Sequence, residues 1–399
     1  MRIACVGGGP AGLYLAILMK ARDRTHEITV FERNPPGVTY GWGVVFWEDL
    51  LEQLRATDPA TASDIAANAF QWNGQRLAVG AREPVHVDGR GYGIGRQQLL
   101  EILVKRARGL GVRVEFESEI ESADDLRDAH LIVACDGVNS RLRELHPEHF
   151  RTEVFVGRNP YIWLGTNRVY DAFTFAFVHT DAGWIWAHAY GFDGRTSTFI
   201  VECAPGTWAG LGFDKLEEPE RIQLLEKLFE RHLEGHALKS KGGAPWLKFR
   251  TVTNEKWHAD NIVLMGDAAH TTHFTIGSGT RLALEDAISL ARRLEEEPSL
   301  ATALDGYEKD RRAALVRTQT EARLSARWFD NVPRYIDLEP GQVLALLLER
   351  RSPLLPRIPA RTYYHLYRAT QRYTALRKLR KWIAPTVKGL YSRASRGAT

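Results

Sequence analysis

The sequence predicts an α/β fold with three parts: a Rossmann-like nucleotide-binding domain, an inserted domain with a mainly antiparallel β-sheet, and a helical C-terminal region. Three observations predict it. Residues 1–32 read as a strand, a glycine-rich turn, a helix and a second strand, the order of a βαβ nucleotide-binding unit. Two later apolar strands end in Asp-Gly or Gly-Asp, and residues 171–203 alternate at the period of a β-strand.

The first turn, "VGGGPAG", has the glycine spacing of a dinucleotide site. Gly7 would make the tight turn, Gly9 would let the backbone approach a pyrophosphate, and Gly12 would let the helix lie close to the sheet. A helix starting at about Pro10 presents free N–H groups and partial positive charge to phosphate. Glu32, after the second strand, can accept hydrogen bonds from an unphosphorylated ribose. The expected contacts are Gly7, Gly9, Pro10, Ala11, Gly12 and Glu32.

Two further apolar strands end in an acid beside a glycine. "AHLIVACDGVNSRLREL" runs into Asp136 and Gly137, and "NIVLMGDAAH" runs into Gly266 and Asp267. A carboxylate at the end of a buried strand is costly unless something bonds to it, although Asp-Gly is also a common turn dipeptide. The first motif alone does not separate FAD from NAD. An NAD dehydrogenase needs only that motif, so the two additional strand ends favour FAD.

The order of these motifs resembles that of the single-component FAD-dependent aromatic hydroxylases, the p-hydroxybenzoate hydroxylase fold, over most of residues 1–330. The resemblance implies that Asp267 binds the ribityl chain of FAD and that Asp136 and Gly137 contact its pyrophosphate region. It also implies flavin contacts from the arginine that heads "RQQLLEILVKRA" and from the pair that follows the second strand. These residues are Arg96, Glu32 and Arg33.

The stretch "GSGTRLALEDAISL" predicts a helix beginning within residues 277–280, because its apolar residues recur at helical spacing. Free N–H groups at this start can stabilise negative charge on the N1–C2=O edge of a reduced flavin. The preceding loop, residues 268–276, would cover the flavin face. The expected contacts in this segment are Gly266, Asp267, Gly277, Ser278, Gly279 and Thr280.

Phe274, in "HTTHFTIGSGT", stands where the wider family usually has a proline. This departure resembles a narrower branch: the salicylyl-CoA and 2-aminobenzoyl-CoA hydroxylases and the tryptophan hydroxylase of violacein biosynthesis. The chain ends without the second flavin domain of the two-enzyme 2-aminobenzoyl-CoA proteins, so we expect no fused reductase activity. Four other segments resemble the branch: "GWGVVF" (41–46), "YIWLGT" (161–166), "AHAY" (187–190) and "STFIVEC" (197–203).

The alternating segment predicts three antiparallel strands in a meander, with an aromatic face toward the flavin. Most of its aromatic residues are expected in the core of that sheet. His188 and Tyr190 alternate with alanines and could line a substrate pocket, although a structural role for His188 is equally compatible with the pattern. His273, in the flavin loop beside Phe274, could be structural, a general base or a substrate hydrogen-bond partner.

The resemblance implies a monooxygenase in which NADH or NADPH reduces FAD, O2 forms a flavin C4a-hydroperoxide, and an electron-rich aromatic ring attacks it. The nicotinamide would bind transiently, since no second dinucleotide motif is found. The expected substrate is an aryl-CoA such as salicylyl-CoA or 2-aminobenzoyl-CoA; the alternative is an indole or tryptophan-type ring. A flavin-dependent reductase would share the three motifs, but the Phe274 loop and "AHAY" favour hydroxylation. A flavin-dependent halogenase is disfavoured because "WIWAHAY" lacks the Ile-Pro of the halogenase signature.

Composition limits the surroundings of the protein. Three distant cysteines, Cys5, Cys135 and Cys203, argue against a disulfide framework or metal site and favour a reducing cytoplasm. No apolar run is long enough for a membrane span. Residues 351–399 carry twelve Lys/Arg and no Asp/Glu. The pattern of this segment predicts a basic amphipathic helix. Such a helix could dock on the body, bind anions such as CoA phosphates, or contact a membrane surface or nucleic acid.

The expected organisation is a discontinuous FAD-binding domain (1–75, 95–155 and 255–330), a substrate domain (76–94 and 156–254), and a basic helical region (331–399). We expect a small aromatic substrate, O2 and no nucleic-acid partner. The protein would be a monomer or a homodimer.

Overall fold

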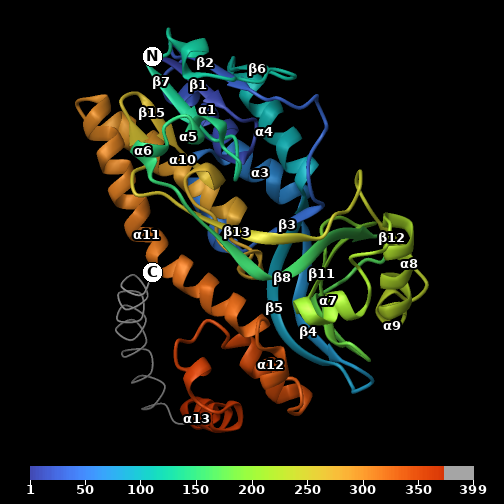
Figure 1. Ribbon diagram of the computed structural model, residues 1–399. Helices are drawn as coiled ribbons and strands as arrows, with labels where there is room; N and C mark the ends of the chain where they lie inside the picture. The colour runs from blue at the N-terminus through green and yellow to red at the C-terminus, as the bar shows by residue number, and fades with distance from the viewer. Residues whose placement is uncertain (373–399) are drawn as a thin grey trace.

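A parallel sheet forms one half of the computed structural model, which describes residues 1–372 (Figure 1). Neighbouring strands in this sheet pair parallel, except that the edge strand β14 (His258–Ala259) pairs antiparallel with β15 (Ile262–Leu264). The carboxyl ends of the central strands therefore meet at one edge, where α/β sheets bind ligands. Its strands, in order, are β14 (His258–Ala259), β15 (Ile262–Leu264), β7 (Leu131–Ala134), β1 (Arg2–Val6), β2 (Glu27–Phe31) and β6 (Arg113–Glu115).

Helix α1 (Pro10–Arg22) lies at the centre of this half and is buried from Ala11 to Met19. It packs against α4 (Arg96–Leu110) and α10 (Gly279–Glu296). The predicted βαβ unit and the predicted helices at 96 and 277–280 are present, and α10 begins two residues into "GSGT". The long α11 (Leu300–Phe329) packs on α10 and leads to the second half (Figure 1).

A nine-stranded, mostly antiparallel sheet forms the second half. The predicted meander is confirmed as β9, β10 and β11, which pair antiparallel in sequence. Three strands from early in the chain also join this sheet, so the chain passes between the two halves several times. The strands are β3 (Gly43–Phe46), β4 (Phe70–Val79), β5 (Val85–Gly95), β8 (Glu153–Thr166), β9 (Phe173–Thr180), β10 (Gly183–Gly191), β11 (Ser197–Cys203), β12 (Leu238–Lys239) and β13 (Leu247–Thr253).

Helices cover both faces of the second sheet. Side chains of α8 (Glu218–Leu228) and α9 (Glu230–Leu233) pack with Ala187, Ala189 and Val201 on one face. On the other face, Phe177 and Trp186 pack with the end of α11, with α12 (Pro340–Leu348) and with α13 (Ala360–Arg372). The remaining helices are α2 (Glu48–Thr57), α3 (Pro59–Asn68), α5 (Arg141–Glu144), α6 (Pro147–Phe150) and α7 (Pro205–Gly210).

The C-terminal region docks on the body as far as the structure describes it. Tyr363 of α13 is buried in the cluster formed with α12, and Tyr367 packs against that cluster. The remainder of the predicted basic helix, residues 373–399, lies outside the described residues. No described helix is long and apolar enough to span a membrane. The residue boundaries proposed for the domains stay a prediction.

Candidate active site

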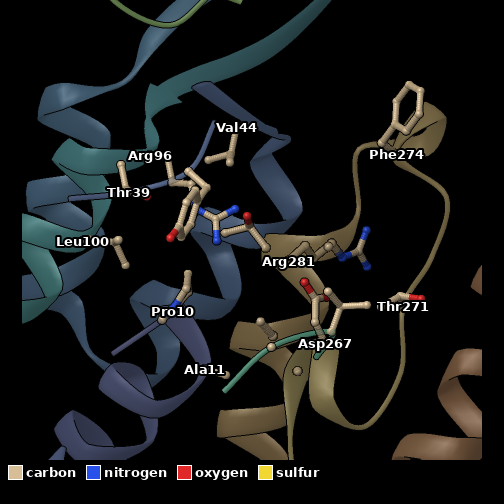
Figure 2. A pocket seen from close by; sticks show the side chains of 18 of the residues that line it. Pro10, Ala11, Thr39, Val44, Arg96, Leu100, Asp267, Thr271, Phe274 and Arg281 are labelled. Carbon is tan, nitrogen blue, oxygen red and sulfur yellow. The ribbon is translucent and has the colours of Figure 1, made fainter. Parts of the chain in front are cut away.

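A cavity of about 2210 Å³ lies between the two sheets. Single-ligand pockets usually enclose about 300–1,000 Å³, so this one has room for a dinucleotide and a second molecule. Its lining comes from the three strand-end motifs, from β4, β9 and β10, from β13 and from the end of α12. Figure 2 shows Pro10, Arg96 and Asp267 around the same space, with Phe274 on the loop beyond.

The glycine turn has the geometry of a phosphate cradle. A Cβ at Gly7 would lie 2.3 Å from the Cys135 carbonyl oxygen, and one at Gly12 would lie 2.5 Å from the Gly7 carbonyl oxygen. Gly9, in contrast, has no neighbour within 4 Å of a built Cβ and lines the cavity. Gly7 and Gly12 are therefore required by the fold, whereas Gly9 leaves open space for a ligand. Glu32 lines the cavity and accepts hydrogen bonds from the Gly8 and Asn34 amides, each at 2.9 Å.

Polar atoms at the centre of the cavity have no partner within the described chain. Arg96 Nε and Asp136 Oδ1 are buried and make no hydrogen bond. Asp267 is surrounded by protein, but its side chain is exposed to the cavity and accepts no hydrogen bond from the described residues. Burial raises the pKa of Asp267, and the nearby Arg96 charge offsets part of that rise. Such orphaned atoms are expected where a polar ligand completes the site.

The Gly266–Asp267 turn is held from below by Asp286 of α10. Asp286 is fully buried, and its Oδ2 accepts the Gly266 amide at 3.0 Å and lies 2.8 Å from His270 Nε2. Arg311 Nε donates to Oδ1 at 2.7 Å. Burial raises the pKa of Asp286, but His270 and Arg311 outweigh it and leave the pKa below its usual range. This charged network fixes the turn that presents Asp267.

The loop after this turn is fixed near its end, where α10 begins. Gly277 has a φ of +63°, and Thr272 and Ser278 share a hydrogen bond of 2.7 Å before α10 begins. Arg350, just beyond α12, donates to the Thr275 carbonyl oxygen at 3.1 Å and to Ser325 Oγ at 3.0 Å. Burial, together with the like charge of Arg351, lowers the pKa of Arg350 to about 9. The C-terminal region thus shapes the loop that faces the cavity.

Aromatic side chains line the part of the cavity formed by the second sheet. Phe173 and Tyr190 stack with ring centroids 5.2 Å apart, and Tyr161 lies 4.7 Å from Phe274. The Tyr190 hydroxyl donates to the Gly43 carbonyl oxygen at 2.9 Å. Flat apolar walls of this kind fit an aromatic ring. The lining here consists of Trp72, Tyr161, Trp163, Phe173, Phe175, His188, Tyr190 and Phe274.

The structure separates the two histidine candidates. His188 lines the cavity, whereas His273 does not and packs instead against Phe249 and Phe274. Burial lowers the pKa of His273 to about 4. His273 Nδ1 is also 3.1 Å from Thr275 Oγ1, which gives it a local structural partner.

The other predicted contacts fall at or beside the cavity. Gly12 lies beneath the glycine turn. The residues that line the cavity are Gly7, Gly9, Pro10, Ala11, Glu32, Arg33, Arg96, Asp136, Gly137, Gly266, Asp267, Phe274, Gly277, Ser278, Gly279 and Thr280.

Sequence reasoning missed three buried charged residues around this cavity. Glu202 stands in "STFIVEC", where a lone acid in an apolar strand was an available signal. Asp286 and Arg350 carry no local signal, because their partners lie 20 and 75 residues away along the chain.

The sequence of this chain is similar to those of known proteins. Residues 127–322 match the FAD binding domain family. The chain is 37% identical to a 3-hydroxy-4-methyl-anthranilyl-[aryl-carrier protein] 5-monooxygenase of Streptosporangium sibiricum, over 84% of this chain and 90% of that protein. This chain belongs to the FAD-dependent aromatic monooxygenases. The resemblance inferred from the motifs is therefore confirmed.

Two other relatives and one solved structure are also similar to this chain. A Streptomyces salicyloyl-CoA 5-hydroxylase is 39% identical over 84% of this chain, which spans 66% of that protein's length. The protodeoxyviolaceinate monooxygenase of Chromobacterium violaceum is 30% identical over 93% of this chain and 100% of its own. A crystal structure of mutant 2-methyl-3-hydroxypyridine-5-carboxylic acid oxygenase matches with a TM-score of 0.70 at 22% identity, over 90% of this chain and 98% of that one. That likeness shows the fold.

Proposed function

We propose that this monooxygenase hydroxylates an electron-rich aromatic ring carried as a coenzyme A thioester, such as salicylyl-CoA or 2-aminobenzoyl-CoA. The observation that carries the proposal is the continuity of one cavity from the dinucleotide motifs, past the aromatic walls, to a basic edge at β13. The salicyloyl-CoA relative supports the same substrate class.

The basic edge suits the phosphates of a coenzyme A. Residues 238–250 contain four Lys/Arg and no acid, and Lys248 and Arg250 line the cavity. Lys241 lies 4.8 Å from the centroid of the Trp42 ring and donates to the Gly41 carbonyl oxygen at 3.4 Å. Cationic side chains without fixed carboxylate partners bind phosphate groups readily.

The motif residues would hold FAD. The Gly7–Gly12 turn and the start of α1 would receive the pyrophosphate, Glu32 the ribose, and Asp267 the ribityl chain. Bound FAD, reduced by NADH or NADPH, would supply the activated oxygen from O2. The N–H groups of Gly279 and Thr280 at the start of α10 would stabilise negative charge on the flavin ring. The walls formed by Tyr161, Phe173 and Phe274 would orient the substrate ring and exclude water.

The test is NADH and NADPH oxidation by the FAD-loaded protein with salicylyl-CoA, 2-aminobenzoyl-CoA, free salicylate, tryptophan and indole, with product masses. One added oxygen on the thioesters alone is the expected result. One added oxygen on tryptophan or indole alone would replace the proposal by an indole-type hydroxylase. The full-length match to the protodeoxyviolaceinate monooxygenase favours that second candidate.

We propose further that the enzyme acts in the cytoplasm as a monomer or homodimer. Its three cysteines are free and buried, which suits a reducing compartment. Light scattering of the purified protein tests the oligomeric state, and a mass above that of a dimer would contradict it.

A further inference from the structure

Glu202 is a buried carboxylate behind the wall of the cavity. Its side chain is 2% exposed. Oε1 accepts from Asn159 Nδ2 at 2.9 Å, and Oε2 accepts from Trp186 Nε1 at 3.1 Å. His188 Nε2 lies 3.2 Å from Oε2. Burial raises the pKa of Glu202, but the hydrogen bond and charge of His188, with help from His273 and Asn159, leave it below its usual range.

These contacts fix the orientation of His188. An ionised carboxylate only accepts hydrogen bonds, so Nε2 of His188 carries a hydrogen, and in the neutral imidazole Nδ1 is then the acceptor. Nδ1 has no hydrogen-bond partner among the described residues, and His188, which is only 2% exposed, lines the cavity. The rings of Phe175, Phe274 and Phe329 surround the imidazole at centroid distances of 5.4, 5.7 and 4.8 Å.

We propose that His188 and Glu202 form a proton-accepting pair that selects and activates an aromatic ring bearing a hydroxyl or amino group. The proposal rests on the proposed function and names a property of its substrate: a dissociable proton on a heteroatom attached to the ring. Glu202 acts as a positioning residue, because it reaches the substrate only through His188.

The pair takes up the heteroatom proton of the substrate and later returns it. The O–H or N–H bond of the substrate breaks, its proton bonds to Nδ1, and the electron pair moves into the ring as the ring carbon bonds to oxygen. Glu202 stabilises the imidazolium that forms. The ring carbon then loses its own hydrogen as a proton, which leaves with the second atom of O2 as water. Aromaticity returns, and His188 returns its proton to the heteroatom. The monooxygenase reaction itself supplies the oxygen atom and the two electrons.

Other ionisable groups near the pair do not replace it. Burial lowers the pKa of His273 to about 4, and His273 does not line the cavity. Burial, with the nearby Glu202 charge, raises the pKa of Asp330 to about 6, while Arg158 opposes that rise. The Arg350 guanidinium lies 5.8 Å from the centroid of the Phe175 ring, and its positive charge favours an ionised substrate oxygen.

The test compares His188→Gln and Glu202→Gln with His179→Gln, a matched change at an exposed position on neighbouring β9. The probes are salicyloyl-CoA, which is the salicylyl-CoA of the panel above, and 2-methoxybenzoyl-CoA, which has no phenolic proton. General-base catalysis contributes about 10²–10⁴-fold. His188→Gln should therefore slow hydroxylation of salicyloyl-CoA by about 100-fold or more, and Glu202→Gln by about 10-fold or more. Both losses should shrink as the pH rises toward ionisation of the free phenol.

A second readout needs no turnover. The absorbance of bound salicyloyl-CoA reports the pH at which its phenol ionises, and that pH should rise in both variants but not in His179→Gln. Flavin absorbance and circular dichroism establish that each variant folds and holds FAD. If His188→Gln misfolds, Glu202→Gln, which keeps the side-chain size, decides the question.

The outcomes separate the two proposals. Wild-type enzyme that hydroxylates no compound of the panel rejects the proposed function, and the ionisation of bound salicyloyl-CoA still tests the pair. Wild-type enzyme that hydroxylates salicyloyl-CoA, together with variants of unchanged rate, pH profile and bound-phenol ionisation, overturns the pair. Equal rates of the wild type on both probes would also overturn it.

Discussion

Replacing Asp286 by alanine should remove the support beneath the Gly266–Asp267 turn. The side chain is fully buried and accepts hydrogen bonds from the Gly266 amide and Arg311, and it is within hydrogen-bonding distance of His270. Its loss leaves Nε of the buried Arg311 and the buried Gly266 amide without an acceptor. Breaking a buried charge pair in this way typically costs about 3–5 kcal/mol.

The magnitude should fall in the lower half of that range. Arg311 retains a second carboxylate, because its Nη2 lies 3.1 Å from Glu285 Oε2. We therefore expect Asp286→Ala to lower the free energy of unfolding by about 3–4 kcal/mol. Asp286→Asn keeps the size and one acceptor oxygen, so its loss should be about 1–3 kcal/mol. With an m value of about 3 kcal/mol/M, the alanine change shifts the urea midpoint by about 1 M.

The assay is urea unfolding of the FAD-free protein followed by circular dichroism, because bound cofactor would add its own stabilisation. Asp305→Ala is the control: Asp305 Oδ1 also lies 3.1 Å from a histidine, His258, but its side chain is 74% exposed. An exposed pair contributes about 0–1 kcal/mol. Equal midpoints for Asp286→Ala and Asp305→Ala would refute the structural role assigned to Asp286.

Three further predictions address the cofactor site and the response to acid. Asp267→Ala should weaken FAD binding about 10–100-fold, since a charged hydrogen bond contributes about 1.5–3 kcal/mol; an unchanged flavin-fluorescence titration would contradict this. Gly9→Ala should keep the unfolding midpoint of the FAD-free protein and weaken FAD binding. Gly12→Ala, whose Cβ would lie 2.5 Å from the Gly7 carbonyl oxygen, should lower the midpoint itself. A lowered midpoint for Gly9→Ala and an unchanged one for Gly12→Ala would contradict the assignment of the glycine turn as a phosphate cradle. Burial raises the pKa of Asp58, but Arg106 and Thr61 outweigh it and leave it below 3.8. The stability from Asp58 is therefore full above about pH 4 and lost as the pH falls through its native pKa. Asp58→Asn should be less stable at pH 7 and lose less stability between pH 5 and pH 2, as urea midpoints at each pH would show.

The sequence determined the local parts of this protein. The glycine turn, the two acid–glycine strand ends, the meander and the start of α10 are each set by residues close together in the chain, through turn geometry and hydrophobic period. The face of β10 was also readable, because alternation separates His188 and Tyr190 from Ala187 and Ala189. From these features the sequence predicted both the family of the protein and its FAD cofactor.

Only the tertiary structure decided which charged groups meet. Glu202 reaches His188 across paired strands, Asp286 reaches Gly266 from within a helix, and Arg350 reaches Thr275 from the C-terminal region. It also set the two histidines apart, one open to the cavity and the other packed behind the loop. The physical reason is that burial and charge pairing depend on which residues fold together, and local sequence patterns do not encode contacts between distant segments.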